Sequence, residues 1–405
     1  MKYLILIISV LFLFSCHKET IKTLEKGSYR AVLKVQDNQE LPFLFEVKND
    51  SLLTIFNANE IITVDEITYK NDSVRIQTPF FEGYIIAKIE DETINGSFIK
   101  SSLDRIVPFK AVKSNNRFSS NTASTQNITG NWETVFSKGS GYDEYLAKGI
   151  FNQKGNNVTG TFRTTTGDYR YLEGIVDGDS LKLSTFDGAH AFLFKAKVTD
   201  STMNGFFYSG NHWKEPFTAK LNNKYELPNE ENLTQIKKGY EEFDFSFPDT
   251  RGRIISLSDP EFKNKIVIIQ IMGTWCPNCL DESKFLVNYL KENPNKDIKI
   301  IALAFEVAKT RAIAFNRIKR LKNRIGNTYP ILLAQFGNSA DKHLAQQKLP
   351  MLNNFISYPT TIFIDKKGSV RKVHTGFNGP ATGEKYMNFK KEFESFIDTL
   401  VNEKE

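Results

Sequence analysis

The sequence predicts a multidomain protein in which a C-terminal α/β domain follows an all-β region of two tandem antiparallel repeats. Two polar segments divide the chain into three blocks, similar motifs recur in the first two blocks, and strand and helix patterns alternate in the third. A chain of 405 residues is also longer than one hydrophobic core usually accommodates. The predicted division is β repeat 1 at 24–113, a linker at 114–127, β repeat 2 at 128–221, a linker at 222–239 and the α/β domain at 240–405.

Composition supports folded domains and argues against a nucleic-acid partner. Hydrophobic residues make up 40% of the chain and aromatic residues 13%, which is enough for several cores. The 53 basic and 47 acidic residues leave a net charge of only +6, and no stripe of basic residues interleaved with aromatic ones is present. We therefore expect no nucleic acid among the partners.

Three pairs of similar segments define the β repeats. The pairs are Asp72–Ile76 with Asp179–Leu183, Ile94–Phe98 with Met203–Phe207, and Pro108–Ala111 with Pro216–Ala219, at offsets of 107, 109 and 108 residues. Short alternating runs between Asn-Gly, Asp-Gly and Lys-Gly turns are typical of antiparallel hairpins. No catalytic constellation is visible in the repeats. His190 and the polar and aromatic segment Thr164–Tyr171 fit either a binding surface or, the favoured interpretation, ordinary turns and strand packing.

Apolar runs alternate with helical periodicities in the third block. Their order predicts a mixed sheet flanked by helices. The predicted strands are 265–271, 298–305, 329–333, 360–365 and 369–374, and the predicted helices are 278–292, 309–324, 339–348 and 384–401.

The predicted helix at 309–324 carries seven basic residues and no acid. Its apolar residues recur at helical spacing, so the basic side chains form the outer face of an amphipathic helix. A solvated face is the expected arrangement. Docking to an acidic partner or to lipid head groups is the alternative.

The N-terminus has the pattern of an export signal. Its apolar core, Leu4–Phe14, is too short to span a bilayer comfortably. The ending Leu13-Phe14-Ser15-Cys16 resembles a bacterial lipobox, in which the cysteine becomes the lipid-modified first residue of the mature protein. We therefore expect a signal peptide at 1–15 and a lipidated tether at 16–23, anchored in a membrane through Cys16. An ordinary cleaved signal with an incidental cysteine is the alternative.

The segment Trp275-Cys276-Pro277-Asn278-Cys279 places two thiols one helical turn apart, directly after an apolar run. A cysteine at the start of a helix lies at the positive end of the helix dipole, which favours the attacking thiolate. Cys279 lies within reach to resolve a mixed disulfide formed at Cys276, so the pair can pass two electrons to or from a partner. A zinc site would need four ligands, and none of the five histidines has finger spacing. A structural disulfide is the remaining alternative.

Two further motifs accompany the cysteine pair. Phe243–Asp249 leads into the first strand of the third block, and Tyr358-Pro359-Thr360-Thr361 opens a later strand. Together the three motifs resemble the thioredoxin superfamily, specifically the TlpA/ResA-like membrane-tethered thiol-disulfide oxidoreductases. The resemblance covers residues 240–405, roughly two fifths of the chain, and implies a thioredoxin fold there.

The resemblance implies roles for individual residues. Cys276 is the exposed nucleophile, Cys279 the buried resolving thiol and Glu282 a carboxylate that accepts the Cys279 proton, with a solvated helix acid as the alternative for Glu282. Pro359 is expected in the cis form beside the cysteines, with a plain loop proline as the alternative. The residues expected to bind substrate are Trp275, Pro277, Tyr358, Pro359 and Thr360, and Trp275 would also shield the pair from water. No cofactor beyond the redox-active disulfide Cys276–Cys279 and no metal are expected.

Three positions depart from the family pattern. Gln270 stands where many thioredoxins have a buried aspartate, so Glu282 or water must take the proton. Ser283 stands where the family commonly has proline. Tyr358 is bulkier than the residue usual before the cis-proline, which leaves the substrate range open.

The expected function is that of a membrane-anchored extracytoplasmic thiol-disulfide oxidoreductase that reduces protein disulfides by dithiol–disulfide exchange. The resemblance alone favours a reductase over an oxidase. The expected partners are protein thiols and disulfides, a membrane electron donor and, through Cys16, the lipid membrane. The expected location is the cell envelope of a bacterium, facing the periplasm or the cell exterior.

Two other functions were compared with this one. A peroxidase of the peroxiredoxin group is disfavoured, because such enzymes place Thr or Ser three residues before the attacking cysteine and proline four before that, where this chain has Gly273 and Ile269. The alternative from another class is a ligand- or protein-binding lipoprotein that uses its β repeats, with the thioredoxin-like domain as an accessory.

Overall fold

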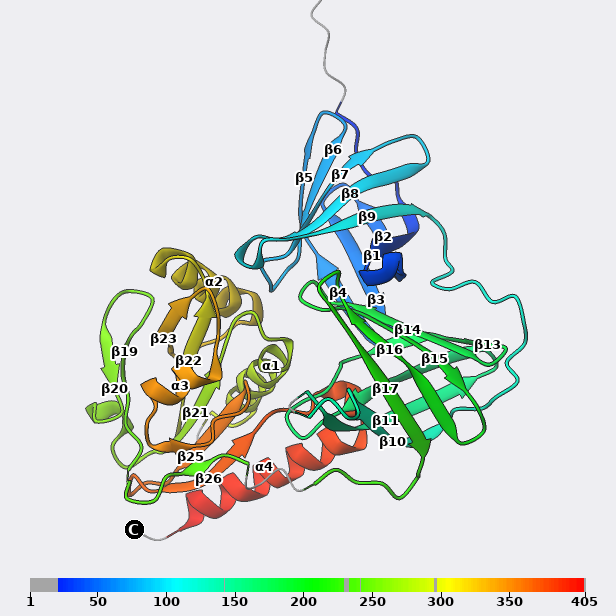
Figure 1. The fold of residues 1–405 in the computed structure, drawn as a ribbon. Helices are drawn as coiled ribbons and strands as arrows, with labels where there is room; N and C mark the ends of the chain where they lie inside the picture. The colour runs from blue at the N-terminus through cyan, green and yellow to red at the C-terminus, as the bar shows by residue number, and fades with distance from the viewer. Residues whose placement is uncertain (1–20, 142, 229–232, 241, 295–296, 404–405) are drawn as a thin grey trace, which may run out of the picture.

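Figure 1 shows the computed structural model, in which a β-sheet at the top, a β-barrel at the right and an α/β domain at the left surround a common centre. The structure describes residues 21–141, 143–228, 233–240, 242–294 and 297–403. The predicted signal peptide and lipidation site Cys16 lie outside the described residues. The predicted fold class, a thioredoxin-fold C-terminal domain after an all-β region of two antiparallel units, is confirmed.

The first unit is an open antiparallel sheet with the order β4-β3-β2-β1-β9-β8-β7-β6-β5. Strands β4 and β5 follow one another in the chain but lie at opposite edges of the sheet. Alternate residues of β9 are buried, which is the period of two that the sequence pattern predicts. The strands are β1 (Gly27–Lys34), β2 (Glu40–Asn49), β3 (Leu52–Asn57), β4 (Glu60–Val64), β5 (Glu66–Lys70), β6 (Ser73–Gln77), β7 (Tyr84–Ile89), β8 (Thr93–Lys100) and β9 (Arg105–Lys113).

The second unit is a closed barrel in which each strand pairs with the next and β17 pairs with β10. Aromatic side chains fill its interior: the Phe136 ring lies 5.4 Å from that of Phe162 and 5.5 Å from that of Phe217. An eight-stranded barrel is just wide enough for such a packed core. The strands are β10 (Gly130–Phe136), β11 (Tyr145–Lys154), β12 (Asn157–Arg163), β13 (Leu172–Asp177), β14 (Ser180–Phe186), β15 (Ala191–Val198), β16 (Thr202–Ser209) and β17 (Trp213–Leu221).

Both β units are built from hairpins, and side chains of both contribute to one hydrophobic cluster. Asp72 and Asp179, which begin the first pair of similar segments, both lie in the turn of a hairpin. Phe43 of β2 stacks on Phe186 of β14 with ring centroids 4.3 Å apart, and Phe98 meets the same ring edge-on at 5.0 Å. The units differ in closure: the first has nine strands with β4 and β5 at its free edges, whereas the second closes between β10 and β17.

The α/β domain contains a mixed five-stranded sheet with the order β23-β22-β21-β25-β26. The central strand β21 is parallel to β22 and antiparallel to β25, and all of its residues are buried, as its continuous apolar run predicts. The sheet strands are β21 (Ile266–Met272), β22 (Ile298–Val307), β23 (Ile331–Gly337), β25 (Thr360–Ile364) and β26 (Val370–Thr375), and the helices are α1 (Pro277–Glu292), α2 (Arg311–Ile325), α3 (Lys342–Lys348) and α4 (Glu384–Asn402).

Short elements complete the chain. Strand β18 belongs to the segment predicted as a linker at 222–239, yet it pairs with β24 of the α/β domain. The remaining elements are the strands β18 (Gln235–Ile236), β19 (Ser246–Pro248), β20 (Ile254–Ser256) and β24 (Leu352–Asn353) and the 3-10 helices η1 (Gln36–Asn38), η2 (Ser101–Leu103), η3 (Pro260–Phe262) and η4 (Pro380–Thr382).

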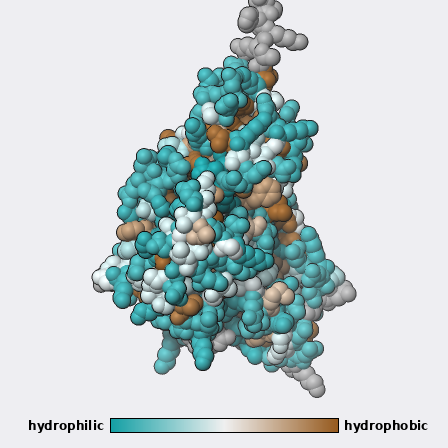
Figure 2. All heavy atoms as spheres, turned by 90° about the vertical axis from the view of Figure 1, so that its right-hand side faces the viewer, coloured by the Kyte–Doolittle hydropathy of each residue, from teal (hydrophilic) through white to brown (hydrophobic). Residues whose placement is uncertain are grey.

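The face of the molecule shown in Figure 2 is mainly hydrophilic. On the face that Figure 2 presents, hydrophobic side chains appear in small groups among hydrophilic ones. The apolar side chains gather instead in three buried clusters that correspond to the first sheet, the barrel and the α/β domain. Within the described ranges, no helix is both long and apolar enough to cross a membrane.

The basic face of helix α2 docks on the first β-sheet. Its ion pairs are Arg317 with Glu82, Arg320 with Glu66 and Arg324 with Asp65. The expected solvated face is therefore wrong for these three arginines, whereas Arg311 and Lys319 of the same helix are exposed. Docking to an acidic partner, the alternative, takes place within the same chain, since a turn and a strand edge of the sheet supply the carboxylates.

Replacing Arg320 with glutamate is expected to lower the free energy of unfolding by about 1 kcal/mol, because attraction to Glu66 becomes repulsion at a partly exposed site. The loss should shrink as ionic strength rises. Chemical denaturation of the full-length protein at low and high salt measures both effects. The control is Arg311→Glu on the same helix, where the arginine is exposed and has no ion pair among the described residues. An equal loss in the control would contradict the docking contact.

Candidate active site

The two cysteines lie where β21 ends and α1 begins. Cys276 is the N-cap of α1 and Pro277 its first residue, a position that suits the fixed backbone of proline. The cysteines form a disulfide, and the Cys279 backbone N–H donates to the Cys276 sulfur at 3.2 Å. Cys276 is 6% exposed and Cys279 is fully buried, so Cys276 is the more accessible of the two cysteines but is not the exposed residue that the resemblance implies. In the reduced pair, that N–H and the helix dipole favour a thiolate at Cys276.

The loop before β25 lies against the cysteines. The Tyr358–Pro359 peptide bond is cis, as the resemblance implies, and the Tyr358 carbonyl oxygen lies 3.6 Å from the Cys276 sulfur. Thr360 is fully buried, and its hydroxyl donates to the Ser357 carbonyl at 2.8 Å. Thr360 therefore holds the loop in place from behind.

Glu282 is buried beside the cysteine pair, so the alternative of a solvated helix acid is wrong. Its carboxylate is 2% exposed and accepts hydrogen bonds from the Thr361 hydroxyl at 2.6 Å and the Gln270 amide at 2.8 Å. The same amide donates to the Cys279 carbonyl at 3.3 Å, and the Ser283 hydroxyl donates to Gln270 at 3.0 Å. Burial raises the pKa of Glu282 to about 7, although both hydrogen bonds to the carboxylate favour its charged form. Such a group can exchange a proton near neutral pH.

A second buried acid, Glu306, was not among the predicted site residues. It is buried at the end of β22 and accepts hydrogen bonds from the Thr274 backbone N–H at 2.8 Å and from the Thr274 hydroxyl at 2.5 Å. Burial raises the pKa of Glu306. Glu306 thus fixes the residue two positions before Cys276. Its signal was present in the sequence, because it is the one acid in the mostly apolar run 298–307.

The barrel segment 164–171 contacts both active-site motifs. The Thr166 carbonyl accepts a hydrogen bond from the Ser357 hydroxyl at 3.3 Å, and the Asp168 carbonyl accepts one from the Asn278 amide at 3.4 Å. Asn278 lies between the two cysteines, and Ser357 lies next to the cis peptide. The segment is therefore part of the active-site surroundings, which corrects the favoured interpretation of ordinary turns and strand packing.

Arg170 joins all three units beside the cysteine motif. Its side chain is 4% exposed and pairs with three carboxylates. They are Glu60 of the first sheet, Asp187 of the barrel and Asp281 of α1. The Arg170 guanidinium also donates to the Pro277 carbonyl at 3.3 Å. The sequence gives no sign of this junction, since its members are distant in the chain.

A cleft of about 1520 Å³ opens beside Cys276, between the α/β domain and the two β units. Three of the five residues predicted to bind substrate, Trp275, Pro277 and Tyr358, line it, whereas Pro359 and Thr360 are buried behind that wall. The Trp275 indole meets the Tyr358 ring edge-on, with centroids 5.5 Å apart. The cysteine pair and the loop of the cis peptide therefore face a space large enough for a client.

Comparisons with known proteins found similar sequences and structures. A family model described as the AhpC/TSA family matches residues 239–373. The chain is similar to the thioredoxin-like protein YneN of Bacillus subtilis, with 29% identity over 35% of this chain and 73% of YneN. It is also similar to a solution structure of a putative protein disulfide isomerase from Bacteroides thetaiotaomicron, with 20% identity over 42% of this chain and 93% of that chain and a TM-score of 0.31. The thiol-disulfide oxidoreductase ResA of Bacillus subtilis is 30% identical over 38% of this chain and 77% of ResA. The chain therefore belongs to the ResA family of thiol-disulfide oxidoreductases.

Proposed function

We propose that this protein reduces protein disulfides outside the cytoplasm as a membrane-anchored thiol-disulfide oxidoreductase. The observation that carries the proposal is the position of Cys276, which caps α1, lies beside the Tyr358 carbonyl and borders the cleft. A thiolate is favoured at that position and is the species that attacks disulfides.

Each cycle transfers two electrons to the client. The Cys276 thiolate attacks one sulfur of the client disulfide, which breaks that bond, forms a mixed disulfide and releases one client thiolate. Cys279 then gives its proton to Glu282 and attacks the Cys276 sulfur, which forms the Cys276–Cys279 disulfide and releases the second client thiolate. A dithiol donor in the membrane, by the same exchange in reverse order, returns the pair to its reduced form.

Reduction of insulin disulfides by the full-length protein tests the activity. With dithiothreitol as electron source, precipitation of the insulin B chain should begin sooner than with dithiothreitol alone. Protein that has been reduced and alkylated at both cysteines is the control and should give no acceleration. Equal rates of insulin reduction with active and alkylated protein would contradict the proposed reductase activity. The reduction potential of the pair decides the direction, since a value above that of client disulfides would make the protein an oxidant.

The anchor is a separate part of the proposal. The lipobox-like sequence supports lipidation of Cys16 and a place in a bacterial cell envelope, facing the periplasm or the exterior. Mass spectrometry of the mature N-terminus is expected to find a diacylglycerol-modified Cys16. An unmodified Cys16, or cleavage at another residue, would contradict the anchor without affecting the redox proposal.

A further inference from the structure

The β units supply the walls of the active-site cleft that face the redox domain. These walls combine apolar and basic side chains. They include Phe98, Lys100 and Arg105 of the first sheet and Tyr145, Tyr169, Phe192 and His212 of the barrel. A client that reaches Cys276 therefore also touches the β region.

The size of the cleft favours an extended chain segment as its occupant. Its volume of about 1520 Å³ exceeds the roughly 300–1,000 Å³ typical of small-molecule pockets. Cys276 is 6% exposed, so a client disulfide must enter the cleft before its sulfur can be attacked. An extended segment rises about 3.3 Å per residue and places alternate side chains on opposite walls. A disulfide on the flat surface of a folded domain should therefore react more slowly than one in an extended segment.

Two cations in the β walls have no carboxylate partner. Among the described residues, neither Lys100 nor Arg105 forms an ion pair, and the Lys100 ammonium donates to the Ala189 carbonyl at 3.1 Å. Burial and the neighbouring Arg105 lower the pKa of Lys100 to about 8. Burial, with the charges of Arg105 and Lys100, also lowers the pKa of His212 to about 4, so that ring is neutral at pH 7. A bound anion would relieve the repulsion between the two cations.

The acids that line the same cleft are engaged by the protein itself. Their partners are Arg317 for Glu82, the Gly139 N–H for Glu144, the Gly379 N–H for Asp168 and the His343 N–H for Asp341. The acids that attract Lys100 are Glu82 and Asp187, and they pair with Arg317 and Arg170. The charge that lacks a partner at the end of the cleft formed by Lys100 and Arg105 is therefore positive.

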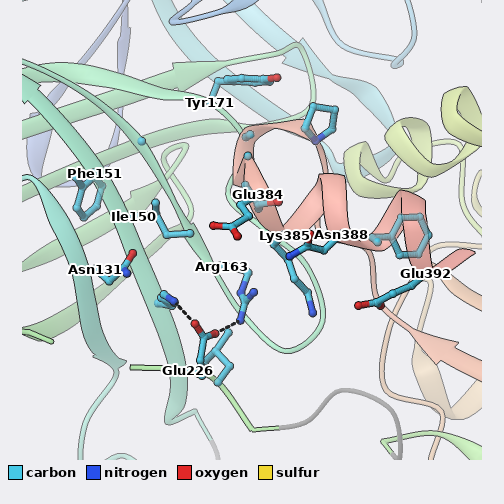
Figure 3. A pocket seen from close by; sticks show the side chains of 18 of the residues that line it. Asn131, Ile150, Phe151, Arg163, Tyr171, Glu226, Glu384, Lys385, Asn388 and Glu392 are labelled. Carbon is cyan, nitrogen blue, oxygen red and sulfur yellow. Dashed lines mark hydrogen bonds and ion pairs between the residues drawn. The ribbon is translucent and has the colours of Figure 1, made fainter. Parts of the chain in front are cut away.

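A second cavity, shown in Figure 3, provides a contrast. It has a volume of about 940 Å³ and lies between the barrel and α4, and neither cysteine lines it. Its Lys148 and Arg163 both pair with Glu226, drawn with dashed lines in Figure 3. These two cations share the carboxylate of Glu226, whereas Lys100 and Arg105 have no carboxylate partner among the described residues.

We propose that the cleft binds an extended, disulfide-bearing segment of a client polypeptide that carries an acidic side chain, with the acid between Lys100 and Arg105 and the disulfide at Cys276. Apolar residues of the segment pack on Tyr169 and Phe192. The β region thus selects clients for the redox pair. This inference rests on the proposed function and adds a preference for unfolded, acidic segments.

Two synthetic peptides test the preference. Each contains one intramolecular disulfide in the same apolar sequence, and they differ only in carrying two glutamates or two lysines beside it. With dithiothreitol as electron source, full-length wild type should reduce the acidic peptide with a kcat/KM about 10-fold higher than the basic one. In Arg105→Glu the preference should reverse. Lys110→Glu, an exposed residue of the same strand β9 that does not line the cleft, is the matched control and should behave as wild type.

The outcomes separate this inference from the proposed function. Equal rates for the two peptides in wild type, or the same change in Arg105→Glu and Lys110→Glu, would overturn the acidic preference. Reduction of a folded protein with a surface disulfide as fast as the acidic peptide would overturn the extended segment. A neutral small disulfide, hydroxyethyl disulfide, is assayed in parallel with wild type. Failure to reduce it would instead contradict the redox function itself.

Discussion

Replacement of Arg170 by methionine should lower the free energy of unfolding of the full-length protein by about 3–5 kcal/mol, because it leaves buried carboxylates without their cation. Three units meet at this side chain, which is 4% exposed. The carboxylates that lose their partner are Glu60, Asp187 and Asp281. We therefore expect the β region and the redox domain to separate before either unfolds completely.

The pH dependence of the stability lost in Arg170→Met shows whether the unpaired carboxylates cause that loss. Burial raises the pKa of Asp187, but His190 and Arg170 more than offset burial and hold that pKa below its usual range. Without Arg170 the attraction that helps to lower the pKa of Asp187 is missing, so the ionised carboxylate contributes less stability. That contribution is present above the unfolded pKa of 3.8 and is lost as pH falls toward the lower folded pKa. The loss of stability in the variant should accordingly be smaller at about pH 3 than at about pH 7.

Thermal and urea unfolding, with limited proteolysis between the units, measure the effect. Arg163→Met is the matched control, because Arg163 is a barrel arginine with a 7% exposed side chain whose partner Glu226 is 67% exposed. Water can solvate Glu226 when its partner is removed, so the free energy of unfolding should fall less in Arg163→Met than in Arg170→Met. Equal losses of unfolding free energy in the two variants would contradict the claim that the Arg170 ion pairs hold the three units together. A loss in Arg170→Met that is independent of pH would contradict it as well.

The sequence predicts elements well where the signal is local. The apolar run of β21 and the turn at Cys276 define a buried strand and a helix start, and observed bounds lie close to the predicted ones. The junction at Arg170 has no local signal, because Glu60 and Asp281 lie 110 and 111 residues away. Helix α2 shows the same limit: periodicity finds its basic face but not the acidic surface that covers it.

The candidate site also contains parts that a short sequence motif predicts and parts that depend on contacts between distant residues. The cysteine motif and the proline loop are recognisable as short sequences. The burial of Glu282 is not, since the hydroxyl that covers it belongs to Thr361, 79 residues along the chain. The β walls of the cleft are also unpredictable from the sequence, because they depend on how three separately folded units pack together.

Replacement of Glu282 by glutamine should slow dithiol–disulfide exchange by about 100-fold at neutral pH, because only water is then left to take the Cys279 proton. Glutamine preserves the size of the side chain and can still bond to Thr361 and Gln270. In wild type, the rate should rise with pH through an inflection near the Glu282 pKa of about 7, since the charged form is the base. In Glu282→Gln that inflection should disappear, and the rate should rise only as Cys279 itself ionises.

Stability gives an independent measure of the same titration. Because burial raises the folded pKa of Glu282 above the unfolded value of 4.5, the protonated group contributes stability below about pH 4.5 that is lost as pH rises through about 7. Glu282→Gln lacks this dependence, so its stability relative to wild type should improve between about pH 5 and pH 8 even as its activity falls. Glu292→Gln, an exposed acid at the other end of α1, is the control and should change neither profile. If Glu282→Gln keeps the inflection near pH 7, another group carries the proton, and Glu282 serves only to hold Gln270 against the Cys279 carbonyl.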